Sequence, residues 1–393
     1  MKIVHVEDVF HPDTGYQLNL LSKYMVAAGH DVTIICAETT RLPKDFMSFF
    51  GSEDINKRDA EFTRKYGVRI IRVPIYGYYS GRAFLSSELF RIIKKENPDI
   101  VYVHGNDTVT GIRFLLHRKE LNYPLVMDSH MLDMAAKNRF SKVFRLAYRY
   151  LFTPIIISNK IPVIRTQDSD FVEKAYGIPL SQAPWISTGS DTMLFKPDKS
   201  VKEWMRRNQN IPDNAFVITY AGKLDEAKGG MLLADALYEK LSCDKELCFV
   251  VIGNTNGDYG KKVEQRLSES KNRIIRFPTQ KYMELAPFFQ MSDLVVFPKQ
   301  CSLSFYDAQA CGIPVIFEDN EVNSKRAMYN SAKTFVRDSI DGIRDCIVEM
   351  ASMSNENYMK MSDAAVAMVK NSYDYKDICN IYLSILEKEI GRV

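Results

Sequence analysis

The chain has 393 residues, of which 46% are hydrophobic and 26% are charged, and this composition is typical of a folded protein with more than one core. The formal net charge of +3 is too small to indicate nucleic-acid binding, so no nucleic-acid partner is expected. Seven cysteines, odd in number and without a C-x-x-C pair, indicate reduced thiols and a cytoplasmic location. The start, MKIVHVEDVF, is typical of a strand rather than a signal peptide. The sequence contains no run of about 20 apolar residues, so no membrane-spanning helix is expected.

Short β-branched runs alternate with helical patterns through the first half of the chain. Runs that are apolar on both faces are typical of parallel sheets covered by helices. The expected strands are residues 2–6, 31–37, 68–75, 99–105, 124–130 and 161–166. The charged piece at 51–67 is expected to be a long surface loop or a solvated helix.

The second half repeats this scheme and then turns helical after about residue 338. Its expected strands are residues 215–223, 247–253, 273–278, 293–298, 314–319 and 333–336. The segment between the halves, residues 181–200, is rich in Pro, Gly, Ser and Asp and has no periodicity, as a hinge would. The sequence therefore predicts an α/β protein with two doubly wound domains, whose ligands would bind beyond the carboxyl ends of the strands.

Two strand-to-helix turns have the residues that anions prefer. Gly15 precedes a helical pattern, where it either lets an anion approach the helix start or serves a turn only. Lys223 follows the first strand of the second half, and Lys228 precedes two glycines that open the next helix. Two lysines converging on a helix start suit a diphosphate, although a solvated loop would explain the same residues.

Further polar residues follow other strands. His130 ends the strand at 124–130, either as a site residue or as a hydrogen-bonded structural histidine. In CSLSFYDA, the N–H groups of Leu303 and Ser304 start a helix and could meet phosphate oxygens. Asp307 lies in the first turn, where it could accept bonds from ribose hydroxyls or complement the helix dipole.

Residues 140–152, FSKVFRLAYRYLF, predict a basic amphipathic helix. Val143, Phe144 and Leu151 share one face, and Lys142, Arg145 and Arg149 lie largely on others. Such a helix, with Arg139 before it, could rest on an anionic membrane through residues 139–152. Alternatively, the apolar face packs into the protein core and the basic face is exposed to solvent.

The motifs, taken in order, resemble the retaining glycosyltransferases of the GT-B fold, in the large family that builds bacterial surface glycans and lipid-linked sugars. The resemblance covers nearly the whole chain and rests on AAGHDVTII, PWISTGSDTMLFKPD, YAGKLDEAKGG and DAQACGIPVI. It implies two Rossmann-like domains facing a central cleft: an acceptor domain at 1–190, a nucleotide-sugar domain at 191–373 and a helix at 374–393 that crosses back.

The resemblance also implies roles for individual residues. The family transfers a sugar from a nucleotide donor, here a UDP- or GDP-sugar, to a hydroxyl of a glycan or lipid-linked acceptor, with retention and without an active-site metal or other cofactor. Lys223, where the family usually has arginine, and Lys228 would hold the leaving diphosphate. Gly15 matches the glycine that contacts the diphosphate, and His130 matches the histidine near the donor sugar. Pro278 and Thr279 match the segment that meets the nucleobase.

The family's carboxylate pair, E-x7-E, is altered. Asp307 occupies the second place, the ribose contact, and Lys299 stands in the first. Because lysine only donates hydrogen bonds, Lys299 fits a donor sugar with an anionic group, or else it lies outside the pocket while Ser302 or Ser304 contacts the sugar.

These features predict a cytoplasmic, membrane-peripheral glycosyltransferase for a surface polysaccharide, lipopolysaccharide or glycolipid, acting at the inner face of the plasma membrane. A degenerate GT-B subunit that serves as a scaffold is the alternative from another class. A sugar epimerase of the same fold is disfavoured by the string DAQACGIPVI.

Overall fold

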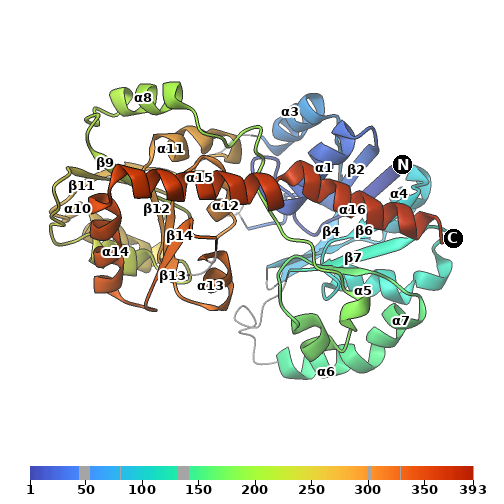
Figure 1. Ribbon diagram of the computed structural model, residues 1–393. Coiled ribbons are helices and arrows are strands. Elements are labelled where there is room, and N and C mark those ends of the chain that lie inside the picture. The colour runs from blue at the N-terminus through green and yellow to red at the C-terminus, as the bar shows by residue number, and fades with distance from the viewer. Residues whose placement is uncertain (44–53, 80, 131–140, 300–301, 328, 393) are drawn as a thin grey trace. The chain divides into compact units, whose positions relative to one another are not determined.

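The computed structural model describes residues 1–43, 54–79, 81–130, 141–299, 302–327 and 329–392 (Figure 1). By their contacts, these residues form two compact units. Unit 1 is Met1–Thr188 with Tyr375–Val393, and unit 2 is Gly189–Asp374. Each unit has a six-stranded parallel sheet in the doubly wound order, so the predicted α/β fold class is confirmed.

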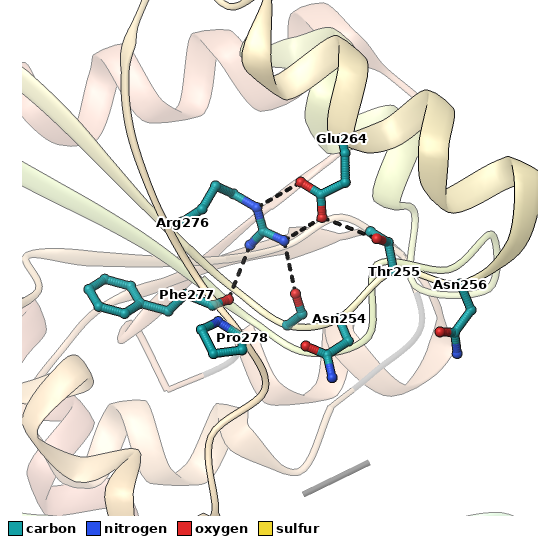
Figure 2. A pocket seen from close by; sticks show the side chains of 8 residues that line it. Asn254, Thr255, Asn256, Glu264, Arg276, Phe277 and Pro278 are labelled. Atoms are coloured by element: carbon teal, nitrogen blue, oxygen red, sulfur yellow. Dashed lines mark hydrogen bonds and ion pairs between the residues drawn. The ribbon is translucent and has the colours of Figure 1, made fainter. Parts of the chain in front are cut away.

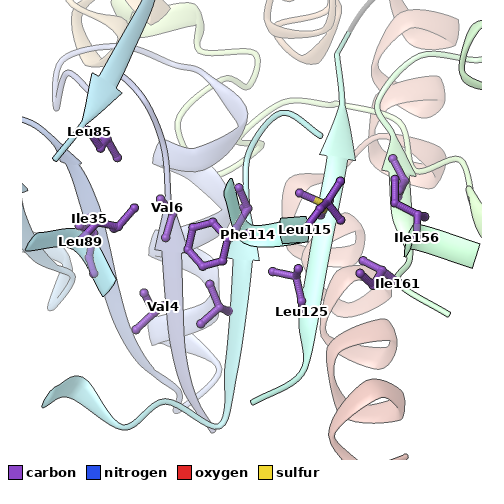
Figure 3. Close-up of a cluster of buried hydrophobic side chains, with 14 of the residues drawn as sticks. Val4, Val6, Ile35, Leu85, Leu89, Phe114, Leu115, Leu125, Ile156 and Ile161 are labelled. Carbon is purple, nitrogen blue, oxygen red and sulfur yellow. The ribbon is translucent and has the colours of Figure 1, made fainter. Parts of the chain in front are cut away.

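Unit 1 has the strand order β3-β2-β1-β6-β7-β8. Its strands are β1 (Lys2–Val6), β2 (Asp31–Ala37), β3 (Arg69–Val73), β6 (Ile100–Val103), β7 (Leu125–Ser129) and β8 (Val163–Arg165). The described helices are α1 (Gln17–Ala27), α3 (Ile55–Tyr66), α4 (Glu88–Glu96), α5 (Val109–Leu116), α6 (Ser141–Leu151), α7 (Thr153–Ser158) and α16 (Tyr375–Ile390). Alternate strand residues such as Val4 and Val6 meet Leu89 and Phe114 in a continuous apolar core (Figure 3).

Two local features of unit 1 differ from the simplest expectation. The charged segment at 51–67 contains helix α3, capped by the Asp54 side chain and ended by Gly67 at φ +74°, so the solvated-helix alternative holds from residue 55. The run expected as one strand at 68–75 is interrupted at Pro74. Strand β4 (Ile75–Tyr79) then leaves the sheet and pairs antiparallel with β5 (Arg82–Leu85); Pro74, which has no N–H to donate, separates it from the edge strand β3.

Helix α16 brings the last residues of the chain back to unit 1, where it packs on α1 (Figure 1). Tyr375, Tyr382 and Leu386 are almost completely buried there. Gln17 Nε2 donates to the Tyr382 hydroxyl at 2.8 Å, and the Tyr24 and Tyr375 rings stack at 6.4 Å. The apolar and hydrogen-bonded face of α1 is thus completed by residues more than 350 positions away.

Unit 2 has the strand order β11-β10-β9-β12-β13-β14. Its strands are β9 (Phe216–Ala221), β10 (Leu247–Ile252), β11 (Arg273–Phe277), β12 (Leu294–Phe297), β13 (Val315–Glu318) and β14 (Ala332–Phe335). Its helices are α8 (Lys199–Asn208), α9 (Gly230–Ala236), α10 (Gly257–Ser268), α11 (Ala286–Met291), α12 (Ser304–Ala310), α13 (Glu321–Ala327), α14 (Ile340–Ser352) and α15 (Asn355–Ser372). In both sheets the order reverses beside the first strand of the unit, β1 or β9. Loops that leave the carboxyl ends there diverge and leave room for a ligand.

Candidate active site

The loop between β9 and α9 places Lys223 and Lys228 at the reversal point of unit 2. Lys223 is exposed directly after the strand, and the buried Tyr220 hydroxyl donates to its carbonyl at 2.5 Å. The backbone N–H of Lys228 donates to Asp225 Oδ1 at 2.9 Å, which shapes the turn. Both ammonium groups are therefore carried on a backbone that has fixed hydrogen bonds.

Gly229 joins this loop to the one that follows β12. Gly229 caps α9 at φ +76°, and a Cβ built on it would lie 2.9 Å from Lys299 Cγ and 3.0 Å from Pro298 Cβ. A side chain would therefore be strained by the backbone and would collide with the neighbouring loop. This close packing of two loops explains Gly229, whereas a Cβ on Gly230 would lie 2.8 Å from the backbone of Leu224 in the same loop.

In the loop after β12, the structure describes Pro298 and Lys299 and then continues from Ser302. The Ser304 N–H group donates to Ser302 Oγ at 3.3 Å, so this helix-start donor already has an acceptor. Arg326, 8% exposed, donates to the Ser302 carbonyl at 3.0 Å and lies over the rings of Phe305 and Tyr306. Arg326 thus fixes the backbone just before α12, at Ser302, next to Leu303.

Asp307 lies in α12 with its side chain directed into the interior of unit 2. Its Oδ1 accepts hydrogen bonds from Ser190 Oγ at 2.7 Å and from the Tyr282 hydroxyl at 3.1 Å, and the residue is 3% exposed. Burial raises the pKa of Asp307 to about 7, although the bonds from Ser190 and Tyr282 oppose the shift. The expected ribose contact stays a prediction, and it would have to share this carboxylate with Ser190 and Tyr282.

Lys299 forms an ion pair in place of the family's first carboxylate. Its Nζ lies 2.6 Å from Asp338 Oδ1, and the two side chains are 32% and 59% exposed. The hydrogen bond to Asp338 raises the pKa of Lys299. Asp338 follows β14 at φ +55°, and its N–H donates to Glu318 Oε1 at 3.2 Å. The site thus keeps a carboxylate here, but on a different loop.

A pocket of about 430 Å³ opens at the carboxyl ends of β10 and β11 (Figure 2). It is lined by Asn254, Thr255, Glu264, Arg276, Phe277 and Pro278 together with Gly253 and Asn256. Arg276 pairs with Glu264 at 2.6 Å. Asn254 and Thr279 exchange two hydrogen bonds of 3.0 Å, in which Asn254 N–H donates to Thr279 Oγ1 and Thr279 N–H donates to Asn254 Oδ1. This exchange fixes the loop that contains Pro278 and Thr279.

In unit 1, Gly15 lies just before α1, in a loop tied down at several points. Thr14 Oγ1 donates to Asn19 Oδ1 at 2.6 Å, and Asn19 Nδ2 donates to the His11 carbonyl at 3.0 Å. Arg58 of α3 binds Asp13 through Nε at 2.8 Å. The backbone that approaches Gly15 is therefore organised by α1 and α3 together.

His130 lies at the end of β7 in a hydrogen-bonded network. Its Nε2 is 3.2 Å from Asp128 Oδ1 and its Nδ1 is 3.2 Å from Thr166 Oγ1. The His130 ring is 40% exposed; its partial desolvation would lower its pKa, but the Asp128 carboxylate, together with Glu7, outweighs this and raises the pKa. His104, Asp128 and His130 offer ligand-type atoms within 4.8 Å of one another. Because the Asp128 carboxylate already bonds His104 at 2.7 Å and lies 3.2 Å from His130, we interpret the cluster as a network rather than a metal centre.

Helix α6 shows a different exposure pattern from the one its sequence suggested. Tyr148 is its buried residue, and its hydroxyl donates to the Asn106 carbonyl at 2.9 Å. Val143, Leu146 and Tyr150, three or four residues apart, are 69%, 59% and 70% exposed. The alternative in which Val143 and Leu151 pack into the core is therefore wrong, since Leu151 is also 62% exposed.

The basic residues of α6 are only partly turned to solvent. The Arg145 guanidinium lies over the Phe171 ring at 4.8 Å, and Arg149 donates to the carbonyls of Glu173 and Lys174. Lys142 is exposed. Arg139 and Phe140 lie outside the described residues. Among the helices that the structure describes, none is both long and apolar enough to cross a membrane.

Several side chains in these sites were not selected from the sequence. Asp128 lies two residues before His130, on the same side of β7, and this i, i+2 spacing is the signal that could have paired them. Asp338 and Arg326 gave no comparable signal, because their partners Lys299 and Ser302 come from distant loops.

Two protein-family models match this chain. The model described as Glycosyltransferase Family 4 matches residues 15–193, and the one described as Glycosyl transferases group 1 matches residues 215–352. Together they cover most of both units. The chain therefore belongs to the family 4 glycosyltransferases. It is a retaining glycosyltransferase that uses a nucleotide sugar, as the sequence motifs predicted.

Individual relatives extend this finding. A protein of Thermosipho melanesiensis described as a probable sucrose-phosphate synthase is 23% identical over 96% of this chain and 92% of its own length. A D-inositol 3-phosphate glycosyltransferase of Catenulispora acidiphila is 24% identical over 62% of this chain, and the match spans 60% of that enzyme. The HepE protein of Anabaena, solved in complex with UDP-glucose, superposes with a TM-score of 0.72 at 16% identity, over 99% of this chain and all of HepE. These likenesses confirm the predicted GT-B fold.

Proposed function

We propose that this enzyme transfers a glycosyl group from a UDP- or GDP-sugar to a hydroxyl of a glycan or lipid-linked acceptor at an anionic membrane surface. The product would belong to a surface polysaccharide, a lipopolysaccharide or a glycolipid, made at the cytoplasmic face of the membrane. The observation that carries this proposal is the outward apolar stripe of Val143, Leu146 and Tyr150 on α6, with the exposed Lys142 beside it. Apolar side chains flanked by a cation suit a bilayer interface with anionic lipids.

The donor diphosphate would bind the lysines of unit 2. Lys223 and Lys228 lie at the end of β9, and their loop is packed by Gly229 against the loop that follows β12. As the bond to the sugar breaks, negative charge grows on the leaving diphosphate, and preorganised cations stabilise it more than they stabilise the bound substrate. Gly15 and the Leu303 N–H would approach the same group, as the family resemblance implies.

The rest of the donor would be recognised by neighbouring loops. Pro278 and Thr279 would meet the base through backbone groups, supported by the bonds between Asn254 and Thr279. Asp307 would accept from the ribose, and Ser302 or Ser304 would lie nearest the sugar. His130 would contact the sugar from unit 1. HepE was solved with UDP-glucose, which makes UDP-glucose the first donor to test.

A nucleotide-sugar screen tests the donor part of the proposal. UDP-glucose, UDP-glucuronate and GDP-mannose are compared with UDP and GDP by thermal shift, since a ligand that binds the folded state raises the melting temperature. Turnover of the binding donor is then measured in Lys223→Ala and Lys228→Ala. Each variant should lose roughly 3–4 kcal/mol of transition-state stabilisation, a fall of 10²- to 10³-fold in kcat.

The control for the lysines is Lys240→Ala, an exposed lysine beyond the far end of α9, which should leave turnover unchanged. Normal turnover in Lys223→Ala or Lys228→Ala would overturn the phosphate assignment. Measurable nucleotide binding without transfer or hydrolysis of any donor would instead favour the scaffold alternative.

Cosedimentation with vesicles tests the membrane part. Leu146→Ser with Tyr150→Ser should reduce binding to vesicles that contain an anionic lipid, while the wild type binds them less as salt rises. These positions are chosen over Arg145 and Arg149 because the arginines make protein contacts. The matched control on the same unit is Lys57→Gln with Lys65→Gln on α3, both exposed. Equal binding by the α6 variant and the wild type would remove the membrane from the proposal.

A further inference from the structure

The Asp128 carboxylate occupies the centre of the buried network in unit 1. Oδ1 accepts from the Gly105 N–H at 2.7 Å and faces His130 Nε2 at 3.2 Å, and Oδ2 faces His104 Nδ1 at 2.7 Å. The residue is completely buried. One carboxylate thus serves two imidazole rings and a backbone N–H from the loop after β6.

The protonation of Asp128 follows from these partners. Burial alone would raise its pKa, but His130 and His104 outweigh burial and hold the pKa of Asp128 well below its ordinary value. An ionised carboxylate has no proton to donate. The protons of these contacts must therefore lie on His104 Nδ1 and on His130 Nε2.

The inner end of the network carries no second charge. His104 Nε2 lies 3.0 Å from His5 Nδ1, and His5 Nε2 lies 3.3 Å from Met25 Sδ. Burial and the neighbouring His104 lower the pKa of His5 well below its ordinary value, so His5 is neutral. The side chain of His130 is 40% exposed, whereas that of His104 is 1% exposed. His130 is therefore the ring through which this network meets solvent or a ligand.

The second ring nitrogen of His130 has an exchangeable partner. His130 Nδ1 lies 3.2 Å from Thr166 Oγ1, and the same hydroxyl lies 3.3 Å from the Ser129 carbonyl. If Nδ1 turned to a ligand, Thr166 would keep the Ser129 carbonyl as an acceptor. The other charged groups that act on His130 are Glu7, which favours its charged form, and Arg82 of β5, which opposes it.

We propose that Asp128 is the positioning residue of His130: it holds the Nε2 proton and leaves Nδ1 as the ring atom that exchanges Thr166 for the donor. In the neutral ring Nδ1 accepts from a hydroxyl of the donor, and in the protonated ring it donates to a phosphate oxygen. This inference rests on the proposed role of His130 beside the donor. The proton that His130 gains or loses with pH then resides on Nδ1, the side open to the ligand. The tautomer of His130 is set from inside the unit, without any substrate contact.

Ring NMR of the histidines tests this directly. In the wild-type protein, the neutral form of His130 should carry its proton on Nε2 and should titrate above the ordinary value of 6.5. In Asp128→Asn, the pKa of His130 should fall by about 1 to 3 units, because the close opposite charge is lost. The matched control is Glu120→Gln, which removes the carboxylate from the exposed His117–Glu120 pair at 3.1 Å. This control should leave His130 unchanged.

Kinetics with UDP-glucose provide the second readout. Asp128→Asn should lower kcat by at least about tenfold with a smaller change in KM, because the imidazole remains present but loses its fixed tautomer. A variant that unfolded would lose both parameters and its far-UV dichroism. Failure of the wild type to turn over UDP-glucose would count against the proposed donor alone, since the ring titration still decides the role of Asp128.

Thr166→Val covers the case in which Asp128→Asn does not fold. With the Thr166 hydroxyl gone, Asp128 should still keep the proton of His130 on Nε2. A neutral His130 with its proton on Nδ1, in the wild type or in Thr166→Val, would overturn the proposal. So would an unshifted His130 pKa in folded Asp128→Asn.

Discussion

The Asp307 carboxyl group is buried, and two hydroxyl groups donate to it, from Ser190 and Tyr282. Its pKa rises from an ordinary 3.8 to about 7. In the unfolded chain the group loses its proton near 3.8, so between these two values the folded state holds a proton that the unfolded state has lost. The free energy of unfolding therefore falls as pH rises through this window, by about 1.4 kcal/mol per unit at most.

We predict that Asp307→Asn removes this loss. The asparagine oxygen can accept the same two hydrogen bonds but has no charge to bury, so the variant should gain stability relative to the wild type between pH 4 and pH 7. Urea denaturation at several pH values measures the difference. Asp244→Asn, at an exposed position of the same unit, should show no such trend. A stability difference independent of pH would contradict the buried-carboxyl explanation.

Lys299 and Asp338 lead to a prediction about donor choice. Because Lys299 is paired with Asp338, its charge is partly neutralised, and the wild type should show little preference for UDP-glucuronate over UDP-glucose. Asp338→Asn should free Lys299 and raise that preference by up to about fivefold, the scale of an exposed ion pair. The comparison is the ratio of kcat/KM for the two donors. An unchanged ratio would place Lys299 outside the sugar site.

At the scale of elements, helix α16 depends on a hydrogen bond to α1. Tyr382→Phe should leave Gln17 Nε2 without its acceptor while Gln17 Oε1 is already without a partner, and should lower the free energy of unfolding by about 1–3 kcal/mol. Chemical denaturation measures this loss. Ile381→Ala, next to it but 51% exposed, is the control and should cost much less. Equal effects would mean that the hydrogen bond contributes nothing specific.

The elements themselves were largely predictable, because apolar β-branched runs of parallel strands can be recognised locally. Local patterns could not predict which side chains contact one another in the folded protein. Arg145 and Arg149 were assigned to a solvent-exposed face. Arg149 is exposed, but the segment after β8 folds back on α6, so that Arg145 also contacts the Phe171 ring and Arg149 the carbonyls of Glu173 and Lys174. The β4–β5 hairpin was missed because Pro74 divides what looked like one run.

In the candidate site too, contiguous motifs were predictable from the sequence, whereas contacts between distant segments were not. Lys223 and Lys228 were recognisable because the whole motif, from strand to paired glycines, is contiguous. The network around Asp128 draws His5, His104 and His130 from the ends of three strands, and it becomes visible only when β1, β6 and β7 are placed in register. Sequence reasoning therefore selected His130 as a site residue but gave no role to the neighbouring Asp128.

At the scale of the whole molecule, the family implies that protein cations replace a metal beside the diphosphate. We predict that transfer continues in excess EDTA, because Lys223 and Lys228 supply the positive charge. Initial rates with and without chelator measure this, and a preparation with added Mg²⁺ is the reference. Activity lost in EDTA and restored by Mg²⁺ or Mn²⁺ would contradict a metal-free mechanism.

Because α16 belongs to unit 1, unit 1 cannot be completed during synthesis until after unit 2 has been made. The ribosome completes residues 189–374 before it makes Tyr375 and Tyr382, so every residue of unit 2 emerges before unit 1 has its last helix. Until then the face of α1 around Gln17 and Tyr24 lacks the contacts that α16 provides. Domains usually finish folding from the N-terminus onward, whereas here the unit that begins the chain is the last to be completed.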